Sequence, residues 1–171
     1  QEVMRVSRFA SAFAAVLFLL AFCVPAGLSP AYAAVPKKKS KVHWMDYTTA
    51  LAKAKQNPKL IFVDLYADWC VPCRIMEANV YSDPTVASVL NSRFYAVKLN
   101  AESQDTISCD GERKTVQRCY FDTWELSALP AFVLVAPKGL TILTVTDSMS
   151  PEEMQSLLFK FLVKEEEWIK Q

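Results

Sequence analysis

The fold of this chain is decided by residues 63–73, which read Val63-Asp64-Leu65-Tyr66-Ala67-Asp68-Trp69-Cys70-Val71-Pro72-Cys73. Residues 60–66 form a nearly continuous apolar run, as expected of a central strand that is buried on both faces. The stretch ends in a Cys-x-x-Cys pair, after which a helix is expected to continue to about residue 80. The sequence therefore predicts two cysteines at the junction between a buried strand and the N-terminus of a helix.

Two cysteines at the start of a helix have a defined chemistry. Backbone N–H groups and the positive end of the helix dipole lower the pKa of a thiol there, and the thiolate is the reactive nucleophile. Cys70 is therefore the expected attacking group, and Cys73 lies on the same helix face, where it can resolve a mixed disulfide. Pro72 suits the first helical turn because it lacks an N–H that would be unpaired there. Arg74 adds positive charge nearby.

Two other interpretations of this cysteine pair compete with a redox role. An inert structural disulfide is disfavoured by the tight spacing of the pair. Half of a zinc site would need two further ligands, for which Cys109 and Cys119 are the candidates, although they are not spaced as Cys-x-x-Cys. We therefore favour a redox pair and expect no metal site.

The composition of the chain excludes several classes of function. Its 171 residues include 19 Lys and Arg against 18 Asp and Glu, and a net charge of +1 gives no basic surface for nucleic acid. The three glycines are too few for a loop that binds phosphate or a dinucleotide. The single histidine, His43, argues against a histidine-rich metal site and against a Ser-His-Asp triad. The five cysteines remain as the reactive groups, and no cofactor is expected.

The N-terminal residues have the pattern of an export signal. Arg5 and Arg8 precede an apolar run over residues 9–28, and Ala31-Tyr32-Ala33 follows as a small-x-small cleavage signature. We therefore expect a signal peptide at residues 1–33, a basic linker at 34–41 and one folded domain at 42–171. An uncleaved N-terminal membrane anchor is the alternative, because the apolar run is close to spanning length. Cleavage predicts a soluble periplasmic or otherwise extracytoplasmic protein, in a compartment where disulfides persist.

Hydrophobic periodicity on both sides of residues 63–73 predicts alternating strands and helices. Strands are expected at residues 42–44, 60–66, 94–99, 131–135 and 140–145. Helices are expected at residues 46–56, from the cysteine pair to about 80, at 85–90, at 115–126 and from 151 onward. Ser150 and Glu153 form the pattern of a capping box at the start of the last helix. This order predicts an α/β fold with a central mixed β-sheet flanked by helices.

Residues 63–73 resemble the active-site strand and loop of thioredoxins. They are similar in particular to the C-terminal thioredoxin domain of DsbD-type transmembrane disulfide reductases, and the similarity continues through Tyr81-Ser82-Asp83-Pro84-Thr85-Val86. It covers roughly residues 42–162 and implies a thioredoxin fold for the domain at 42–171. The sequence departs from this family in the segment from Cys109 to Cys119, which is an insertion before the family's cis-proline.

The resemblance implies roles for four residues beside the cysteines. Asp64 matches the buried carboxylate behind the pair, where it would take the proton of the second cysteine; a strand aspartate facing solvent is the alternative. Pro130 matches the cis-proline next to the first cysteine, and the backbone of Leu129 would pair with an extended substrate segment; an ordinary proline that leads into a strand is the alternative. Trp69 would shield the sulfurs, with ordinary core packing as the alternative.

The insertion contains a second possible disulfide. Cys109 and Cys119 enclose nine residues, five of them charged, and such a stretch cannot order itself by burying apolar surface. In an oxidising compartment a bridge would pin this loop, so we expect a structural Cys109–Cys119 disulfide. The alternative is a second redox pair that accepts the disulfide from Cys70 and Cys73.

These observations predict an exported thiol–disulfide oxidoreductase that acts on protein disulfides. Strong oxidants of this family usually carry a histidine between the cysteines, which stabilises the reduced form. Val71 and Pro72 offer no such group, so we expect a protein-disulfide reductase, or an electron carrier that a membrane thiol-electron donor reduces again.

Other functions remain as alternatives. A disulfide oxidase or isomerase would use the same cysteines. A copper metallochaperone would hold copper(I) on the two thiolates, with His43 as the available extra ligand. A redox-inert binding module would not need an intact pair. We expect a monomer that binds protein disulfides and no nucleic acid.

Overall fold

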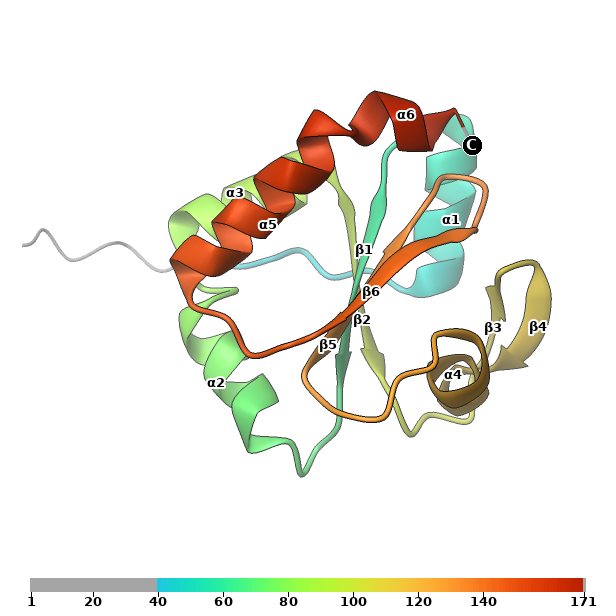
Figure 1. Cartoon of the computed structure of the whole chain (residues 1–171), viewed down its shortest axis with the longest axis horizontal. Coiled ribbons are helices and arrows are strands. Elements are labelled where there is room, and N and C mark those ends of the chain that lie inside the picture. Colours follow the sequence, from blue (N-terminus) through green and yellow to red (C-terminus); the bar gives the residue numbers. More distant parts are fainter. Residues whose placement is uncertain (1–39, 171) are drawn as a thin grey trace, which may run out of the picture. The chain divides into compact units, whose positions relative to one another are not determined.

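The computed structural model describes residues 40–170, which build an α/β fold around a four-stranded sheet (Figure 1). The strand order is β2-β1-β5-β6, formed by β1 (Ile61–Tyr66), β2 (Tyr95–Asn100), β5 (Ala131–Val135) and β6 (Thr141–Thr146). β1 runs parallel to β2 and antiparallel to β5, which is antiparallel to β6. The mixed sheet predicted from the sequence is therefore confirmed, and the strand that leads to Cys70 lies inside it.

Helices cover both faces of the sheet, with α1 on one side and α2, α3 and α5 on the other (Figure 1). Their bounds are α1 (Tyr47–Gln56), α2 (Val71–Asn79), α3 (Pro84–Arg93), α5 (Pro151–Val163) and the short α6 (Glu165–Ile169). Asp46 and Asp83 cap the N-termini of α1 and α3 with their carboxylates. The predicted capping box of α5 is confirmed, since Ser150 Oγ accepts from Glu153 N and Glu153 Oε2 accepts from Ser150 N.

Each face of the sheet has its own hydrophobic core, because side chains along a strand alternate between the two faces. Ile61, Val63 and Leu65 of β1 are buried with α1 and the insertion in the first core. Phe62 is buried with α2, α3 and α5 in the second core. Asp64 lies two residues after Phe62 on the strand, so its carboxylate points to the same face of the sheet, the face that α2 covers.

The first strand expected at residues 42–44 is absent. Only Met45 forms a single parallel bridge to β2. The backbone next to it is satisfied by a side chain of α3 instead: Asn91 Oδ1 accepts from His43 N at 2.8 Å, and Asn91 Nδ2 donates to Lys41 O at 2.9 Å. A side chain therefore takes the hydrogen bonds that a strand would need.

The segment around the second cysteine pair forms a hairpin, where we expected an irregular loop pinned by a disulfide. β3 (Thr106–Cys109) pairs antiparallel with β4 (Glu112–Thr115) across the turn Asp110-Gly111. The φ values of the two turn residues are 48° and 84°, the geometry that Asp-Gly favours in two-residue hairpins. The hairpin is also anchored to the domain, because Ile107 is buried in the first core. Asp110 Oδ1 accepts the first backbone N–H of β6 at 2.5 Å.

The prediction of one regular helix at residues 115–126 is also wrong. β4 ends at Thr115, whose hydroxyl starts the three-residue helix α4 (Val116–Arg118), and the chain then widens into the π-helix η1 (Cys119–Thr123). Trp124 N donates to the carbonyl five residues back at 2.8 Å. The apolar residues of this segment pack into the first core: Val116, Cys119, Tyr120, Trp124 and Leu126.

The predicted signal peptide at 1–33 and most of the predicted linker at 34–41 lie outside the described residues. Among residues 40–170, none of the helices has the length and apolar character needed to cross a bilayer.

Candidate active site

The cysteine pair lies where β1 turns into α2. Cys70 is the N-cap residue of α2, its Sγ accepts a hydrogen bond from Cys73 N at 3.2 Å, and Pro72 occupies the first turn. The two cysteines form a disulfide with their Cα atoms 5.3 Å apart, and both side chains are nearly buried. This hydrogen bond directs the free N–H of Cys73, in the first helical turn, at the Cys70 sulfur, where it can stabilise a thiolate.

Asp64 is a buried carboxylate on the strand that leads to the pair. The residue is only 4% exposed, so the solvent-facing alternative is wrong. Tyr81 OH donates to Asp64 Oδ1 at 2.8 Å, and Lys98 Nζ lies 3.6 Å from Oδ2. Burial raises the pKa of Asp64 to about 6, although the Lys98 charge and the Tyr81 hydrogen bond both act to lower it.

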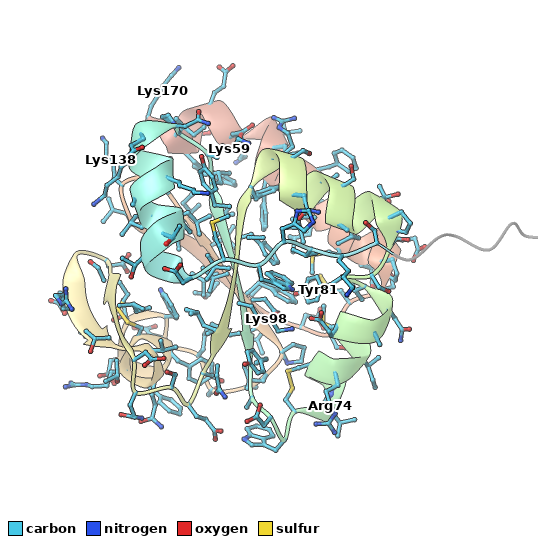
Figure 2. The ribbon with its side chains drawn as sticks, turned by 180° about the vertical axis from the view of Figure 1, so that it is seen from behind. Lys59, Arg74, Tyr81, Lys98, Lys138 and Lys170 are labelled. Atoms are coloured by element: carbon cyan, nitrogen blue, oxygen red, sulfur yellow. A yellow bond between two sulfur atoms is a disulfide. The ribbon has the colours of Figure 1, made fainter. Side chains whose placement is uncertain are left out.

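Lys98 forms ion pairs with two carboxylates near the disulfide, those of Asp64 and Glu77. It stands directly beside Asp64 in the parallel register of β1 and β2, and its ammonium also pairs with the carboxylate of Glu77 on α2. It lies 5.1 Å from the ring centroid of Tyr66 and 5.9 Å from that of Tyr81. Figure 2 shows Lys98 and Tyr81 beside each other between β2 and α2.

The roles of Lys98, Glu77 and Tyr81 were not predicted from the sequence. Lys98 reaches the site only through pairing between strands whose chain segments are far apart, and no local motif marks it. Tyr81 belongs to the stretch that extends the resemblance, but nothing in the sequence indicates that its hydroxyl meets Asp64.

A cleft of about 250 Å³ opens beside the second cysteine. Its lining includes Cys73, Glu77 and Lys98, together with Tyr66 and Arg74. The guanidinium of Arg74 donates to the carbonyl of the loop before Cys70, at 2.6 Å from Asp68 O. The Lys98–Glu77 pair, which contacts Asp64, therefore shares an open cleft with Cys73.

The segment Leu129–Pro130 lies beside the cysteine pair. Its peptide bond is cis, and it directly precedes β5, whose first residue pairs with Leu65. Leu129 packs against the small buried cluster that contains Cys70 and Cys73. The structure thus brings the predicted substrate-pairing segment to the disulfide.

Trp69 lies on the surface next to the first cysteine. The residue is 65% exposed, which rules out the core-packing alternative. Its indole Nε1 donates to Glu102 Oε1 at 3.0 Å, so the ring is tied to the loop after β2. Shielding of the sulfurs by this ring stays a prediction.

Cys109 and Cys119 form the second disulfide, with Cα atoms 6.2 Å apart. Both side chains are buried in the first core, whereas Cys70 and Cys73 belong to a separate cluster. The two pairs therefore do not converge on a shared zinc site. Within residues 40–170, no group of three or more His, Cys, Asp or Glu side chains is arranged to hold a metal ion.

Comparison with known proteins agrees with this geometry. The model of a family described as Thioredox_DsbH, protein of unknown function DUF255, matches residues 30–167. The thiol:disulfide interchange protein DsbD 1 of Pseudomonas aeruginosa is 32% identical over 102 residues, which are 56% of this chain and 16% of that protein. The chain thus spans less than a fifth of this relative's length.

Solved structures show the same fold. A thioredoxin from Thermus thermophilus matches 73% of this chain and 90% of its own with a TM-score of 0.59 at 23% identity. The reduced C-terminal domain of DsbD from Neisseria meningitidis matches 66% of this chain and 91% of its own with a TM-score of 0.50 at 19% identity. At these identities the similarity establishes the thioredoxin fold alone.

Proposed function

This chain belongs to the Thioredox_DsbH family of the thioredoxin superfamily, and we propose that it reduces protein disulfides outside the cytoplasm through Cys70 and Cys73. Its family relationship to DsbD-like proteins supports thiol–disulfide exchange as the reaction class. The observation that carries the proposal is the hydrogen bond from Cys73 N to Cys70 Sγ at the start of α2. The direction of electron flow, the compartment and the role of each residue are parts of the proposal.

In the first step, the Cys70 thiolate of the reduced protein attacks one sulfur of a substrate disulfide. A bond forms between Cys70 Sγ and that sulfur, the substrate S–S bond breaks, and the other substrate sulfur leaves as a thiolate that takes up a proton. The free N–H of Cys73 and the positive end of the α2 dipole stabilise the attacking thiolate. Leu129 and Pro130 provide backbone beside the sulfur for an extended substrate segment.

In the second step, Cys73 resolves the mixed disulfide. The thiol of Cys73 gives up its proton and its sulfur attacks Cys70 Sγ. The bond between Cys70 and the substrate breaks, the substrate sulfur leaves as a thiolate that takes up a proton from water, and the protein becomes the Cys70–Cys73 disulfide. Two electrons have then passed to the substrate. Asp64 accepts the Cys73 proton, because a buried carboxylate with a pKa of about 6 is ionised at neutral pH yet basic enough to take up a proton. The cleft shared by Cys73, Glu77 and Lys98 gives this proton an outlet to water.

Reduction of substrates is favoured over oxidation by the two residues between the cysteines. The side chains of Val71 and Pro72 supply neither a charge nor a hydrogen-bond donor to the thiolate, and stabilisation of the reduced form is what makes a strong oxidant. The resulting disulfide must be reduced again by an external dithiol, for which we propose a membrane thiol-electron donor. The copper-carrier alternative has less support, because His43 is held beside α3 and does not line the cleft next to Cys73.

The reduction potential of the Cys70–Cys73 couple tests the direction of electron flow. Equilibration with defined glutathione or dithiothreitol buffers, followed by alkylation and mass analysis, should give a value near the roughly −270 mV of thioredoxin. A value near the roughly −120 mV of a strong oxidant would overturn the reductase assignment.

Trapping tests the division of labour between the cysteines. A Cys73→Ser variant should accumulate a mixed disulfide with a protein substrate on non-reducing gels, whereas a Cys70→Ser variant should trap nothing and turn over no substrate. Equal trapping by both variants would contradict the assignment of Cys70 as the nucleophile.

A further inference from the structure

We propose that residues 106–123 between β2 and β5, which contain the Cys109–Cys119 insertion together with η1 and are called the insertion from here on, build a side-chain pocket beside the cysteine pair. This pocket selects substrates with an apolar residue flanking their cysteine. The inference rests on the proposed function, since it names the kind of disulfide that the site prefers. The observation behind it is a hollow of about 130 Å³ that the active-site loop and the insertion line together.

The pocket has walls from two sources. One wall comes from the active-site side: Trp69, Glu102 and Leu129. The other comes from α4 and η1 in the insertion: Gln117, Tyr120 and Phe121. Trp69 precedes the nucleophilic cysteine and Leu129 packs against it, so a substrate segment that reaches Cys70 passes over this hollow.

The insertion wall is held in place and not left to move freely. Tyr120 OH donates to Ala128 O at 3.0 Å, which ties η1 to the loop before the cis peptide bond. The residue before Tyr120 is Cys119, which is bridged to Cys109 and buried in the first core. A pre-formed wall lowers the entropic cost of binding a side chain.

The lining favours an apolar occupant. Three aromatic residues, Trp69, Tyr120 and Phe121, are among those that line the hollow, and Phe121 packs edge-on against Tyr120 with ring centroids 4.9 Å apart. Phe121 is nevertheless 55% exposed, so much of its ring has no partner within the domain. The volume of 130 Å³ is close to that of a roughly 150 Å³ cavity that binds benzene, which suits one Leu-sized or Phe-sized side chain. The carboxylate of Glu102 disfavours an acidic occupant.

Single-turnover reduction of two model peptides tests this inference. Each probe is a short peptide dimer joined by one disulfide, with the cysteine flanked on both sides by Leu in one peptide and by Ser in the other. Pre-reduced protein is mixed with each, and disulfide formation in the protein is followed by alkylation and mass analysis. Cystamine, a small disulfide without side chains for the pocket, is run in parallel with the wild-type protein.

We expect the wild type to react roughly ten times faster with the Leu peptide than with the Ser peptide. Phe121→Ser should reduce that preference to less than about twofold, and Phe121→Leu should retain most of it. Phe159→Ser is the matched control, because Phe159 is an aromatic residue of α5 that is 52% exposed and lies outside the pocket lining. This control should keep the full preference.

Three outcomes would overturn the inference while leaving the proposed function intact. They are equal wild-type rates with the two peptides, an equal loss of preference in Phe121→Ser and Phe159→Ser, and a wild-type dimer that Phe121→Ser dissociates, since a second copy would then occupy the pocket. Wild-type protein that reduces neither peptide nor cystamine would instead overturn the proposed function together with this inference.

Discussion

Asp64 is the residue whose chemistry is most constrained by its surroundings. It is buried beside the positive charge of Lys98 and accepts a hydrogen bond from the Tyr81 hydroxyl, yet burial still raises its pKa to about 6. A group in this state fits the second step of the exchange, in which Cys73 must lose a proton, better than the first step, in which the nucleophile is already a thiolate.

The Asp64→Asn variant tests this role directly. We expect resolution of the mixed disulfide at pH 7 to slow by roughly a hundredfold, the lower range of general-base effects, while the initial attack by Cys70 changes little. Rapid-quench trapping of the mixed disulfide separates the two steps. Asp147→Asn serves as the control, since Asp147 is an exposed carboxylate after the end of β6. Unchanged resolution in Asp64→Asn would exclude it as the base.

The same carboxylate predicts how stability depends on pH. Its pKa rises from an ordinary value of 3.8 to about 6 on folding, so between these values the folded state binds more protons than the unfolded state. The free energy of unfolding must therefore fall as pH rises through this window, by roughly 2–3 kcal/mol from this group alone. Urea titrations of wild type and Asp64→Asn from pH 4 to pH 8 should show this fall only in the wild type. Parallel curves for the two proteins would contradict the prediction.

At the scale of secondary structure, local chemistry determines which elements can be predicted from sequence. The strand before the cysteines and the capped start of α5 follow from apolar runs and capping residues, and both are present. The hairpin of β3 and β4 was missed because three of the four residues of β4 are charged, although Asp110-Gly111 is itself a hairpin signal. The prediction of one helix at residues 115–126 was wrong because helical periodicity cannot distinguish a regular helix from the short helix α4 followed by the π-helix η1.

The same limit applies to the candidate site. The cysteines, Asp64 and the cis peptide bond lie in motifs that can be read along the chain. Lys98 and Phe121 come from β2 and from the insertion, and they meet the active-site loop only through sheet pairing and the packing of η1. Side chains supplied by distant segments have no local pattern, so they could not be predicted without the fold.

The Cys109–Cys119 bridge is predicted to stabilise the insertion and not to exchange electrons. Both sulfurs are buried in the first core, away from the cluster of Cys70 and Cys73. The Cys109→Ala/Cys119→Ala double variant should lose roughly 3 kcal/mol of stability in urea unfolding and keep its activity toward small disulfides.

Graded reductant distinguishes this role from its alternative. Under mild dithiothreitol, Cys70–Cys73 should be reduced first while Cys109–Cys119 stays oxidised, as read by alkylation and peptide mass. Reduction of both pairs together, or loss of turnover in the double variant with an unchanged fold, would instead identify a second redox pair.

At the scale of the whole molecule, three separate segments of the chain meet at the site. The end of β1 delivers the cysteines, the start of β5 delivers the cis peptide bond, and the insertion after β2 adds a wall beside Trp69. The sheet keeps the first two in fixed register, with Leu65 paired to Ala131. The cysteines and the cis peptide bond are therefore positioned by the part of the fold that this chain shares with thioredoxins. The wall beside Trp69 comes from the insertion, which the resemblance to that family does not include.

The location of the protein depends on residues 1–33, which lie outside the described part of the chain and which we predict to be a cleaved signal peptide. The prediction rests on Arg5 and Arg8 before an apolar run and on Ala31-Tyr32-Ala33 at its end. Expression of the full sequence in a bacterium, with fractionation and N-terminal sequencing, should yield a periplasmic protein that begins at Ala34. An Ala33→Leu variant should block processing, because the cleavage site requires a small residue there. An unprocessed chain in the membrane fraction of the wild type would show that the segment is an anchor. The cysteine pair could then still act outside the cytoplasm, held at the membrane surface where a thiol-electron donor would reach it.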